Sequence, residues 1–267
     1  MISRKLKLSV IVSTFNRPEA LDLILTALSH QTGKNFEVII ADDGSENETR
    51  ELIDKVKDKV DFKITHIWQE HKEFRAAAIR NKAIVASSGE YLLFIDGDCV
   101  PNIDFINTHL NLAEKNYFVS GNRILLSKKF TDHVLKMHVP IYKWNILQWL
   151  QALFKGDINR ILPLISLNKL LYPRYKLSHK WQGAKTCNLG VWKKDFLAVG
   201  GFDERYWGWG YEDSDLVVRL MHNKILRKDG RFTAPVFHLW HPLSSRTNES
   251  ENYKRLEEII KSSRIDL

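Results

Sequence analysis

The chain of 267 residues contains little cysteine and no long apolar run. Its two cysteines, Cys99 and Cys187, are far apart in the sequence and form no Cys-x-x-Cys pair, so a disulfide framework is not expected and a reducing compartment fits the composition. No stretch approaches the roughly 20 apolar residues of a spanning helix, and the run at residues 8–12 is too short for a signal sequence. We therefore expect a cytoplasmic protein, either soluble or peripheral on the inner face of a membrane.

Acidic residues are outnumbered: 40 Lys and Arg against 32 Asp and Glu give a formal net charge of +8. Such a surplus is compatible with nucleic acid, with an anionic membrane surface, with phosphorylated substrates or with a simple solvated surface. The excess is uneven, because the segment from Lys128 to Lys194 holds many basic and few acidic residues. The acidic residues that form motifs lie outside that segment.

Apolar, β-branched runs alternate with helical patterns through the first hundred residues. The expected strands are residues 8–14, 36–41, 63–68 and 91–95, and the expected helices are 20–28, 48–56 and 76–86. This alternation predicts an α/β fold with right-handed β-α-β units and a mostly parallel central sheet flanked by helices. Polar clusters follow the first, second and fourth strands, and ligands bind at such carboxyl ends.

The pattern changes after about residue 117. Residues 130–180 are rich in aliphatic, aromatic and basic side chains and are interrupted by prolines, which favours helices over sheet. A helix at 213–223, a strand at 236–239 and a polar helix at 251–265 are expected to complete the chain.

Asp96-Gly97-Asp98 directly follows the apolar strand at 91–95. Two carboxylates separated by one residue at a buried strand end repel each other and lose hydration. A divalent cation removes both penalties, and Mg²⁺ or Mn²⁺ prefers carboxylate and phosphate oxygens. Two acids in a surface turn are nonetheless common, so this motif alone leaves both interpretations open.

Four segments in order, Val10–Arg17, Ala41–Ser45, Arg80–Ile84 and Asp96–Asp98, resemble the family 2 glycosyltransferases of GT-A fold. The resemblance covers roughly the first hundred residues and implies a metal-dependent enzyme with a UDP-sugar donor. It implies that Asp98 is the direct metal ligand and that Asp96 faces the ribose or a metal-bound water. The residues it assigns to the nucleotide sugar are Thr14, Asn16, Arg17, Asp42, Asp43, Arg75, Arg80, Lys82, Asp96, Gly97 and, by a weaker match, Asn188.

Chemistry supports parts of that assignment. A carboxylate such as Asp43 can accept a hydrogen bond from the N–H of a uracil ring. The cationic side chains of Arg75, Arg80 and Lys82 suit the charge of a diphosphate, although each could also be a solvated charge on a helix face.

A second signature, Gly200–Glu204 followed by Trp207–Asp215, is similar to the acceptor-side motif of β1,4-galactosyltransferases and of chondroitin-polymerase-type domains. The resemblance implies that Asp213 is the catalytic base, with Glu212 and Trp209 binding the acceptor. The alternative is a cluster of acids stabilised by a helix N-terminus. The sequence departs from the pattern at Tyr211, where glycine is usual, and at Ser214, where an acid is usual.

The segment His238-Leu239-Trp240-His241-Pro242 lies where the same families place a third metal ligand. We expect His241 to bind the metal, with His238 as the alternative, and an imidazole ligand favours Mn²⁺ over Mg²⁺. The residues that follow, 242–248, are expected to form a lid over the donor.

The segment 130–180 fits none of these motifs. Aromatic and aliphatic side chains such as Ile141, Trp144, Ile146, Trp149 and Phe154 alternate there with Lys and Arg. The pattern suits an amphipathic helix lying on anionic lipid, or equally a helix whose apolar face packs on the catalytic domain.

These patterns together predict an inverting glycosyltransferase that moves a hexose or N-acetylhexosamine from a UDP-sugar to a glycan or glycolipid hydroxyl, as in bacterial surface polysaccharide synthesis. The expected organisation is one domain over 1–250, with a nucleotide-sugar-binding half at 1–120 and an acceptor half at 121–250 that includes the insert, followed by a helix at 251–267. The alternatives are a metal-dependent nucleotidyltransferase and a basic nucleic-acid-binding module. The latter would explain the charge but not the acidic motifs, so no nucleic acid partner is expected.

Overall fold

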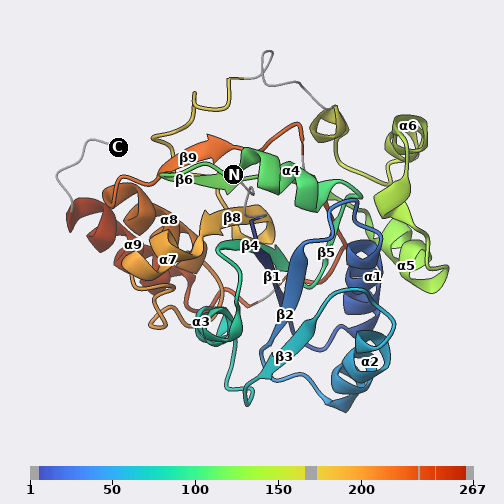
Figure 1. The fold of residues 1–267 in the computed structure, drawn as a ribbon, viewed down its shortest axis with the longest axis horizontal. Helices are drawn as coiled ribbons and strands as arrows, with labels where there is room; N and C mark the ends of the chain where they lie inside the picture. Colours follow the sequence, from blue (N-terminus) through green and yellow to red (C-terminus); the bar gives the residue numbers. More distant parts are fainter. Residues whose placement is uncertain (1–5, 166–172, 234, 244, 263–267) are drawn as a thin grey trace, which may run out of the picture.

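The computed structural model describes residues 6–165, 173–233, 235–243 and 245–262. Within them a seven-stranded sheet forms the centre, with strand order β3-β2-β1-β4-β8-β6-β9 (Figure 1). These strands are β1 (Leu8–Thr14), β2 (Phe36–Asp42), β3 (Ile64–Trp68), β4 (Tyr91–Asp96), β6 (Tyr117–Ser120), β8 (Leu189–Trp192) and β9 (Leu226–Asp229).

The first four strands are parallel to one another, as the alternation of the sequence predicts. Strand β8 enters antiparallel between β4 and β6, and β9 runs parallel to β6 at the edge. One sheet thus joins the first hundred residues to the second half of the chain, and the predicted mostly parallel α/β fold is confirmed.

Helices cover both faces of this sheet (Figure 1). Alternation along β1 divides the core, because Val10 and Val12 pack in one apolar cluster while Ile11 packs in the other. The first cluster includes side chains of α1 (Pro18–Ser29), α2 (Asn47–Lys57) and α4 (Phe105–Leu112), and the second includes those of α3 (Ala76–Ala86), α7 (Lys193–Ala198) and α8 (Glu212–His222).

A second sheet of three short strands has the order β5-β10-β7. Its strands are β5 (Cys99–Pro101), β7 (Arg123–Leu125) and β10 (Val236–His238). In the register of β10 with β5, His238 lies opposite Cys99. This small sheet therefore brings the histidine segment beside the residues that follow β4, although they are far apart in the sequence.

The described part of the insert contains α5 (Lys128–Lys136), α6 (Ile146–Phe154) and the short 3-10 turns at Ile141–Lys143 and Leu162–Leu164, joined by turns and irregular segments. Residues 166–172 of this segment lie outside the described residues. The last helix, α9 (Glu249–Ser262), packs on α8. In the part of the chain that the structure covers, no helix is long and apolar enough to cross a bilayer.

The strand expected at 236–239 is β10, but the sequence did not predict the other strands of the second half. Strands β6, β7, β8 and β9 have three or four residues each, which is too short for an alternating pattern to stand out. The apolar face of the insert mostly packs on the core, since Ile141 and Trp149 are fully buried and the Trp149 ring stacks on Phe237.

Candidate active site

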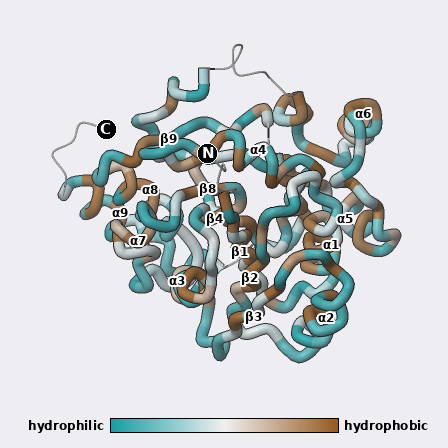
Figure 2. The backbone as a smooth tube through the Cα atoms, viewed as in Figure 1, coloured by the Kyte–Doolittle hydropathy of each residue, from teal (hydrophilic) through white to brown (hydrophobic). Residues whose placement is uncertain are grey.

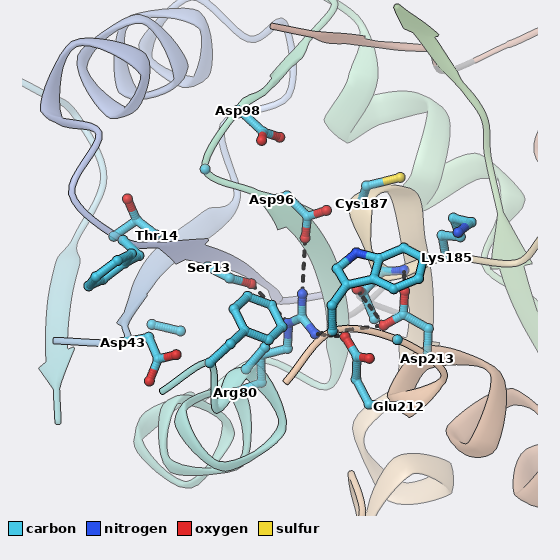
Figure 3. Close-up of a pocket in the computed structure, with 18 of the residues that line it drawn as sticks. Ser13, Thr14, Asp43, Arg80, Asp96, Asp98, Lys185, Cys187, Glu212 and Asp213 are labelled. Atoms are coloured by element: carbon cyan, nitrogen blue, oxygen red, sulfur yellow. Dashed lines mark hydrogen bonds and ion pairs between the residues drawn. The ribbon is translucent and has the colours of Figure 1, made fainter. Parts of the chain in front are cut away.

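A cleft of about 600 Å³ opens at the carboxyl ends of β1, β2 and β4. Side chains from the loops after these strands form one side, and the N-terminus of α8 with the segment before β8 forms the other (Figure 3). Segments from both halves of the sequence therefore line the same space, as the motifs predicted.

The turn that carries the two aspartates is pressed against β1. The Gly97 N–H donates to the Ser13 carbonyl oxygen at 2.6 Å, and a Cβ at position 97 would stand only 2.6 Å from that oxygen. Only glycine permits this close approach without a backbone shift. The role of Gly97 is therefore to let Asp96 and Asp98 leave the end of β4 at a fixed distance from β1.

Asp98 faces both candidate histidines. Its carboxylate oxygens lie 3.2 Å from His241 Nε2 and 3.6 Å from His238 Nε2, and one also accepts from Arg17 at 3.4 Å. Ligand atoms of the two imidazoles and the carboxylate all lie within 4.8 Å of one another. Burial lowers the pKa of His238, which favours the neutral imidazole that metal coordination requires. The donor set therefore fits a divalent cation of borderline softness.

Arg80 lies at the centre of the cleft floor and joins its two sides. Its guanidinium donates to Ser13 Oγ at 2.9 Å, to Asp96 at 3.0 Å and to Glu212 at 3.2 Å, and it stands 3.6 Å from Asp213. The side chain is only 5% exposed, and the neighbouring carboxylates raise its pKa against the opposing effect of burial. Each of its three nitrogens donates to a protein oxygen, but a guanidinium has five N–H donors and Arg80 lines the cleft, so direct contact between Arg80 and a diphosphate stays a prediction.

Burial also raises the pKa of two acids beside this arginine, Asp96 and Glu212. It raises the pKa of Asp96 to about 6, with Arg80 acting in the opposite direction and Asp98 adding to the rise. It raises the pKa of Glu212 to about 7, and the adjacent Asp213 carboxylate contributes. Desolvation therefore outweighs the attraction of one guanidinium shared by several acids.

Asp213 is held by the segment that precedes β8. The Thr186 hydroxyl donates to Asp213 Oδ1 at 2.7 Å, and the Thr186 backbone N–H donates to Oδ2 at 3.1 Å (Figure 3). Both oxygens thus keep defined directions at the start of α8. Tyr211, which precedes Glu212, has φ +73°, a left-handed conformation that favours glycine. This conformation explains why glycine is usual at that position of the motif.

Four predicted nucleotide-binding residues outside the Asp96–Asp98 turn line the cleft, namely Thr14, Arg17, Asp43 and Arg80. The Asp43 carboxylate accepts from Gln69 Nε2 at 2.6 Å and from the Arg75 backbone N–H at 2.7 Å. These bonds fix its orientation at the end of β2, where an unused lone pair can still face a ligand.

Two other predicted nucleotide contacts point away from the cleft. Asp42 is buried, and its carboxylate bonds His66 Nε2 at 2.8 Å and the Ser45 backbone N–H at 2.8 Å. Strand alternation is the reason, because consecutive residues of β2 face opposite sides of the sheet. The Asn16 side chain accepts from the Glu46 backbone N–H at 2.8 Å and shapes the loop after β1.

The remaining predicted residues act through the protein rather than lining the cleft. Lys82 Nζ donates to Gln69 at 3.0 Å, and the Arg75 guanidinium donates to the Glu70 carbonyl oxygen at 2.5 Å. Asn188 is buried and bonds His109 Nε2 at 3.0 Å and the Asn122 carbonyl oxygen at 3.0 Å. A sequence can predict that a residue lies in a helix or a loop. It does not predict whether the side chain of that residue points toward a cleft formed by distant segments.

Sequence reasoning missed several residues of the cleft. Arg123, at the start of β7, lines it and acts electrostatically on Asp96 and Asp98. Lys185, directly before Thr186, also lines it (Figure 3). No pattern could have found Arg123, because the short strand that positions it was not predicted.

The predicted acceptor tryptophan and the predicted lid meet over the cleft. Trp209 lines it, and the Arg246 guanidinium lies 4.5 Å from the centre of its ring, a cation–π contact. Leu243 also lines the cleft from the same segment. Leu243 and Arg246 thus contribute to the wall of the cleft, and a lid role for their segment stays a prediction.

Comparison with protein families decides the class of this chain. The model of glycosyl transferase family 2 matches residues 9–166, more than half of the chain. The chain belongs to this family. A second model, described as the N-terminal domain of galactosyltransferase, matches residues 170–241 and thus the acceptor-side motif and the histidines. The resemblance read from the motifs is confirmed, and family membership favours an enzyme over a nucleic-acid-binding module.

Curated relatives include enzymes of polysaccharide synthesis. The chain is 27% identical to chondroitin synthase of Pasteurella multocida over 82% of its own length and 23% of the relative's. It is 26% identical to validoxylamine A glucosyltransferase of Streptomyces hygroscopicus, over 80% of its length and 51% of the relative's. The chain thus spans about half or less of the length of these relatives.

Solved structures share the fold. S. aureus TarS 1–349 in complex with UDP has a TM-score of 0.64 at 17% identity, over 97% of this chain and 67% of that one. Mannosyltransferase PcManGT from Pyrobaculum calidifontis, in complex with GDP-Man and Mn²⁺, has a TM-score of 0.59 at 15% identity, over 95% and 61%. The GT-A fold expected from the motifs is therefore confirmed.

Proposed function

We propose that this family 2 glycosyltransferase is inverting and transfers a hexose or N-acetylhexosamine from a UDP-sugar to a hydroxyl of a glycan or glycolipid. The observation that carries the proposal is the opposition of two groups across one cleft. Asp98 with its two histidines stands on the donor side, and Glu212 with Asp213 stands on the acceptor side. Bacterial surface polysaccharide synthesis is the process that the relatives suggest.

The metal is proposed to be Mn²⁺, or alternatively Mg²⁺, held by Asp98 and His241 with His238 beside them. Two imidazoles tilt the choice toward Mn²⁺, because Mg²⁺ prefers an all-oxygen set. When bound, such a cation supplies positive charge to the diphosphate of the donor and of the departing UDP. Arg17 and Arg123 flank Asp98 and are proposed to contact the same diphosphate together with Arg80.

The nucleotide is proposed to lie between the loops after β1 and β2. Asp43 offers a carboxylate to the uracil ring N–H, and Thr14 and Arg17 line the same end of the cleft. The structural neighbour S. aureus TarS 1–349 is described in complex with UDP-GlcNAc, which supports a UDP-sugar donor by analogy of fold.

Asp213 is proposed to act as the catalytic base. The acceptor hydroxyl oxygen attacks the anomeric carbon from the face opposite the leaving UDP, its proton passes to an Asp213 carboxylate oxygen, and the bond from carbon to the diphosphate breaks. One attack in line inverts the anomeric configuration. Thr186 holds the base, Glu212 accepts from acceptor hydroxyls, and Trp209 provides an apolar face for a sugar ring.

The decisive experiment is a panel of UDP-sugars with Mn²⁺, scored for UDP release with and without simple glycan acceptors. One donor should give acceptor-dependent release that chelation abolishes, and the product should have the inverted anomeric configuration. GDP-mannose serves as a control for base recognition. Nucleotide-sugar turnover that survives complete chelation, or a product of retained configuration, would contradict the proposal.

We further propose that the acceptor is lipid-linked and that the cytoplasmic enzyme binds the membrane peripherally. On α6 the Leu147 and Phe154 side chains are 65% and 86% exposed, and they share one helix face because they lie seven residues apart. Lys143 and Lys155 stand exposed next to this face, so apolar insertion and attraction to anionic lipid would act together. Figure 2 shows α6 as a largely hydrophobic element at the periphery of the molecule.

Vesicle binding tests this extension. The wild type should sediment with anionic vesicles at low salt, and the double change Leu147→Ser/Phe154→Ser should abolish sedimentation without changing transfer to a soluble acceptor. Leu197→Ser, which removes a 56% exposed leucine from α7, is the matched control and should leave binding intact. Equal sedimentation of the double variant and the wild type would exclude this surface as the membrane contact.

A further inference from the structure

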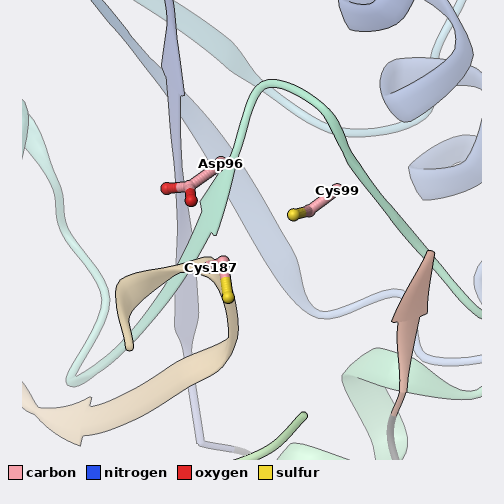
Figure 4. A group of neighbouring side chains, drawn as sticks. All are labelled: Asp96, Cys99 and Cys187. Carbon is pink, nitrogen blue, oxygen red and sulfur yellow. The ribbon is translucent and has the colours of Figure 1, made fainter. Parts of the chain in front are cut away.

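The two cysteines, expected to be separate, meet beneath the cleft. Cys99 begins β5 directly after Asp98, and Cys187 lies directly after Thr186. A sulfur atom from each and a carboxylate oxygen of Asp96 all lie within 4.8 Å of one another (Figure 4). Figure 4 shows Cys99 at the start of β5 and Cys187 in the 3-10 turn Thr186–Asn188 before β8, on neighbouring segments. The antiparallel pairing of β8 with β4 places that turn beside the end of β4, which Cys99 follows closely.

This cluster is accessible from the cleft although it is buried. Cys99 is 0% exposed and Cys187 only 4%, but Cys187 and Asp96 both line the cleft. An ion that enters the cleft therefore meets Asp96 and Cys187 first, with the Cys99 sulfur behind them.

Its chemistry differs from that of the Asp98 cluster. Two thiols with one carboxylate form a soft donor set, and Zn²⁺ or Cd²⁺ binds such sets tetrahedrally with water in the fourth position. Sulfur ligands of one Zn²⁺ stand roughly 3.7 Å apart, given Zn–S bonds of about 2.3 Å, so small side-chain rotations would bring these three groups onto one ion. Hard Mg²⁺ prefers oxygen ligands and would not select this position.

The charged residues around the cluster both favour and oppose the binding of a cation. Asp96 Oδ1 accepts from Arg80, and a carboxylate can bind a guanidinium through one oxygen and a cation through the other. Arg123 interacts electrostatically with both cysteines and with Asp96, which stabilises thiolates but repels a free cation. An ion must therefore form strong bonds to sulfur to remain there, which again selects thiophilic metals.

We propose that Asp96, Cys99 and Cys187 form a second cation site, selective for thiophilic divalent ions, whose occupation blocks transfer. On binding, each thiol releases its proton to solvent and forms one metal–sulfur bond, without any change of oxidation state. The ion would share the Asp96 carboxylate with Arg80 and displace Thr186, which is covalently next to Cys187 and holds Asp213. The inhibition rests on the proposed function, whereas the binding does not.

Cadmium is the probe, because a Cd²⁺–thiolate bond has a charge-transfer absorption in the near ultraviolet. The chain contains only two cysteines, so any such band comes from Cys99 or Cys187. The reduced full-length protein, free of other metals, should bind one Cd²⁺ per chain with the intensity of two thiolates. Cys99→Ser and Cys187→Ser should each halve the band and weaken the affinity about tenfold or more, equivalent to about 1.4 kcal/mol.

The control variant is His241→Gln, which alters the neighbouring cluster and should keep the full band. Absence of the band in the reduced wild type would contradict the proposed cation site. A complex of one Cd²⁺ with two chains would contradict it as well. In the transfer assay with saturating Mn²⁺, Cd²⁺ should inhibit the wild type but not the double Cys99→Ser/Cys187→Ser variant. Equal inhibition of both would overturn the inhibitory role. A protein that shows the band yet transfers no sugar would instead count against the proposed function alone.

Discussion

Thr186 donates two hydrogen bonds to Asp213, one to each carboxylate oxygen, at 2.7 and 3.1 Å. The hydroxyl bond depends on the side chain, whereas the backbone bond does not. A proposed base thus receives its orientation from a residue that belongs to neither acidic motif.

Thr186→Val removes only the hydroxyl bond and should lower kcat about tenfold, because a hydrogen bond to a charged group is worth about 1.5–3 kcal/mol and not all of it acts on the transition state. The KM for the donor should stay unchanged, since Thr186 lies on the acceptor side. Steady-state kinetics with the matched Thr186→Ser variant, which keeps the hydroxyl, provides the check. If the serine variant loses as much activity as the valine variant, the bond to Asp213 does not explain the loss.

Asp213→Asn keeps the size of the side chain and removes its basicity. Transfer should fall by about 10²–10⁴-fold, the range expected for a general base. UDP binding in the presence of Mn²⁺, measured by calorimetry, should remain within about twofold of the wild type, because Asp213 lies across the cleft from the nucleotide loops. Wild-type turnover by this variant would remove Asp213 from the mechanism.

Asp98→Asn should reduce Mn²⁺ affinity most among the three members of its cluster, because it removes the negative charge. His241→Gln should weaken Mn²⁺ binding about tenfold or more, and His238→Gln should have a smaller effect. This order follows from the distances to Asp98, 3.2 Å for His241 and 3.6 Å for His238. Free Mn²⁺ measured by electron paramagnetic resonance gives all three affinities, and the reverse order of the histidines would assign the ligand to His238.

Arg80→Met should destabilise the fold by about 3–5 kcal/mol, because it leaves buried Asp96 and Glu212 without their counter-charge. Urea unfolding near pH 8 without metal, where these acids are ionised, measures the loss. The double change Arg80→Met/Glu212→Gln should recover part of it by removing one buried charge. A single variant as stable as the wild type would mean that the three side chains do not act as one ion-pair network.

Glu212 should make the stability of the protein fall as pH rises. Its pKa is about 7 in the folded protein against an ordinary value of 4.5, so the folded state binds more protons between these values. The contribution to stability is complete below about pH 4.5 and is lost as pH rises through 7. Relative to Glu212→Gln, the free energy of unfolding of the wild type should therefore decrease between about pH 5 and pH 8. A constant difference across this window would show that the carboxyl group does not titrate in it.

The sequence by itself determined the parallel half of the fold and the two faces of the cleft. Short apolar runs such as Val10–Val12 alternate with helical patterns, and the carboxyl ends of parallel strands must lie together. The sequence therefore places Asp43 and Asp98 in one cleft, and the motif around Glu212 and Asp213 identifies its other side.

Only the tertiary structure decided what these groups contact. Arg80 reads as a helix cation that suits a phosphate, but the fold also places it beside two protein carboxylates, Asp96 at the end of β4 and Glu212 at the start of α8. Cys99 and Cys187 read as unrelated, but the antiparallel pairing of the short strand β8 with β4 brings their sulfur atoms together. The physical reason is the same in both cases. Local periodicity fixes which elements form, whereas contacts between distant segments depend on how those elements pack.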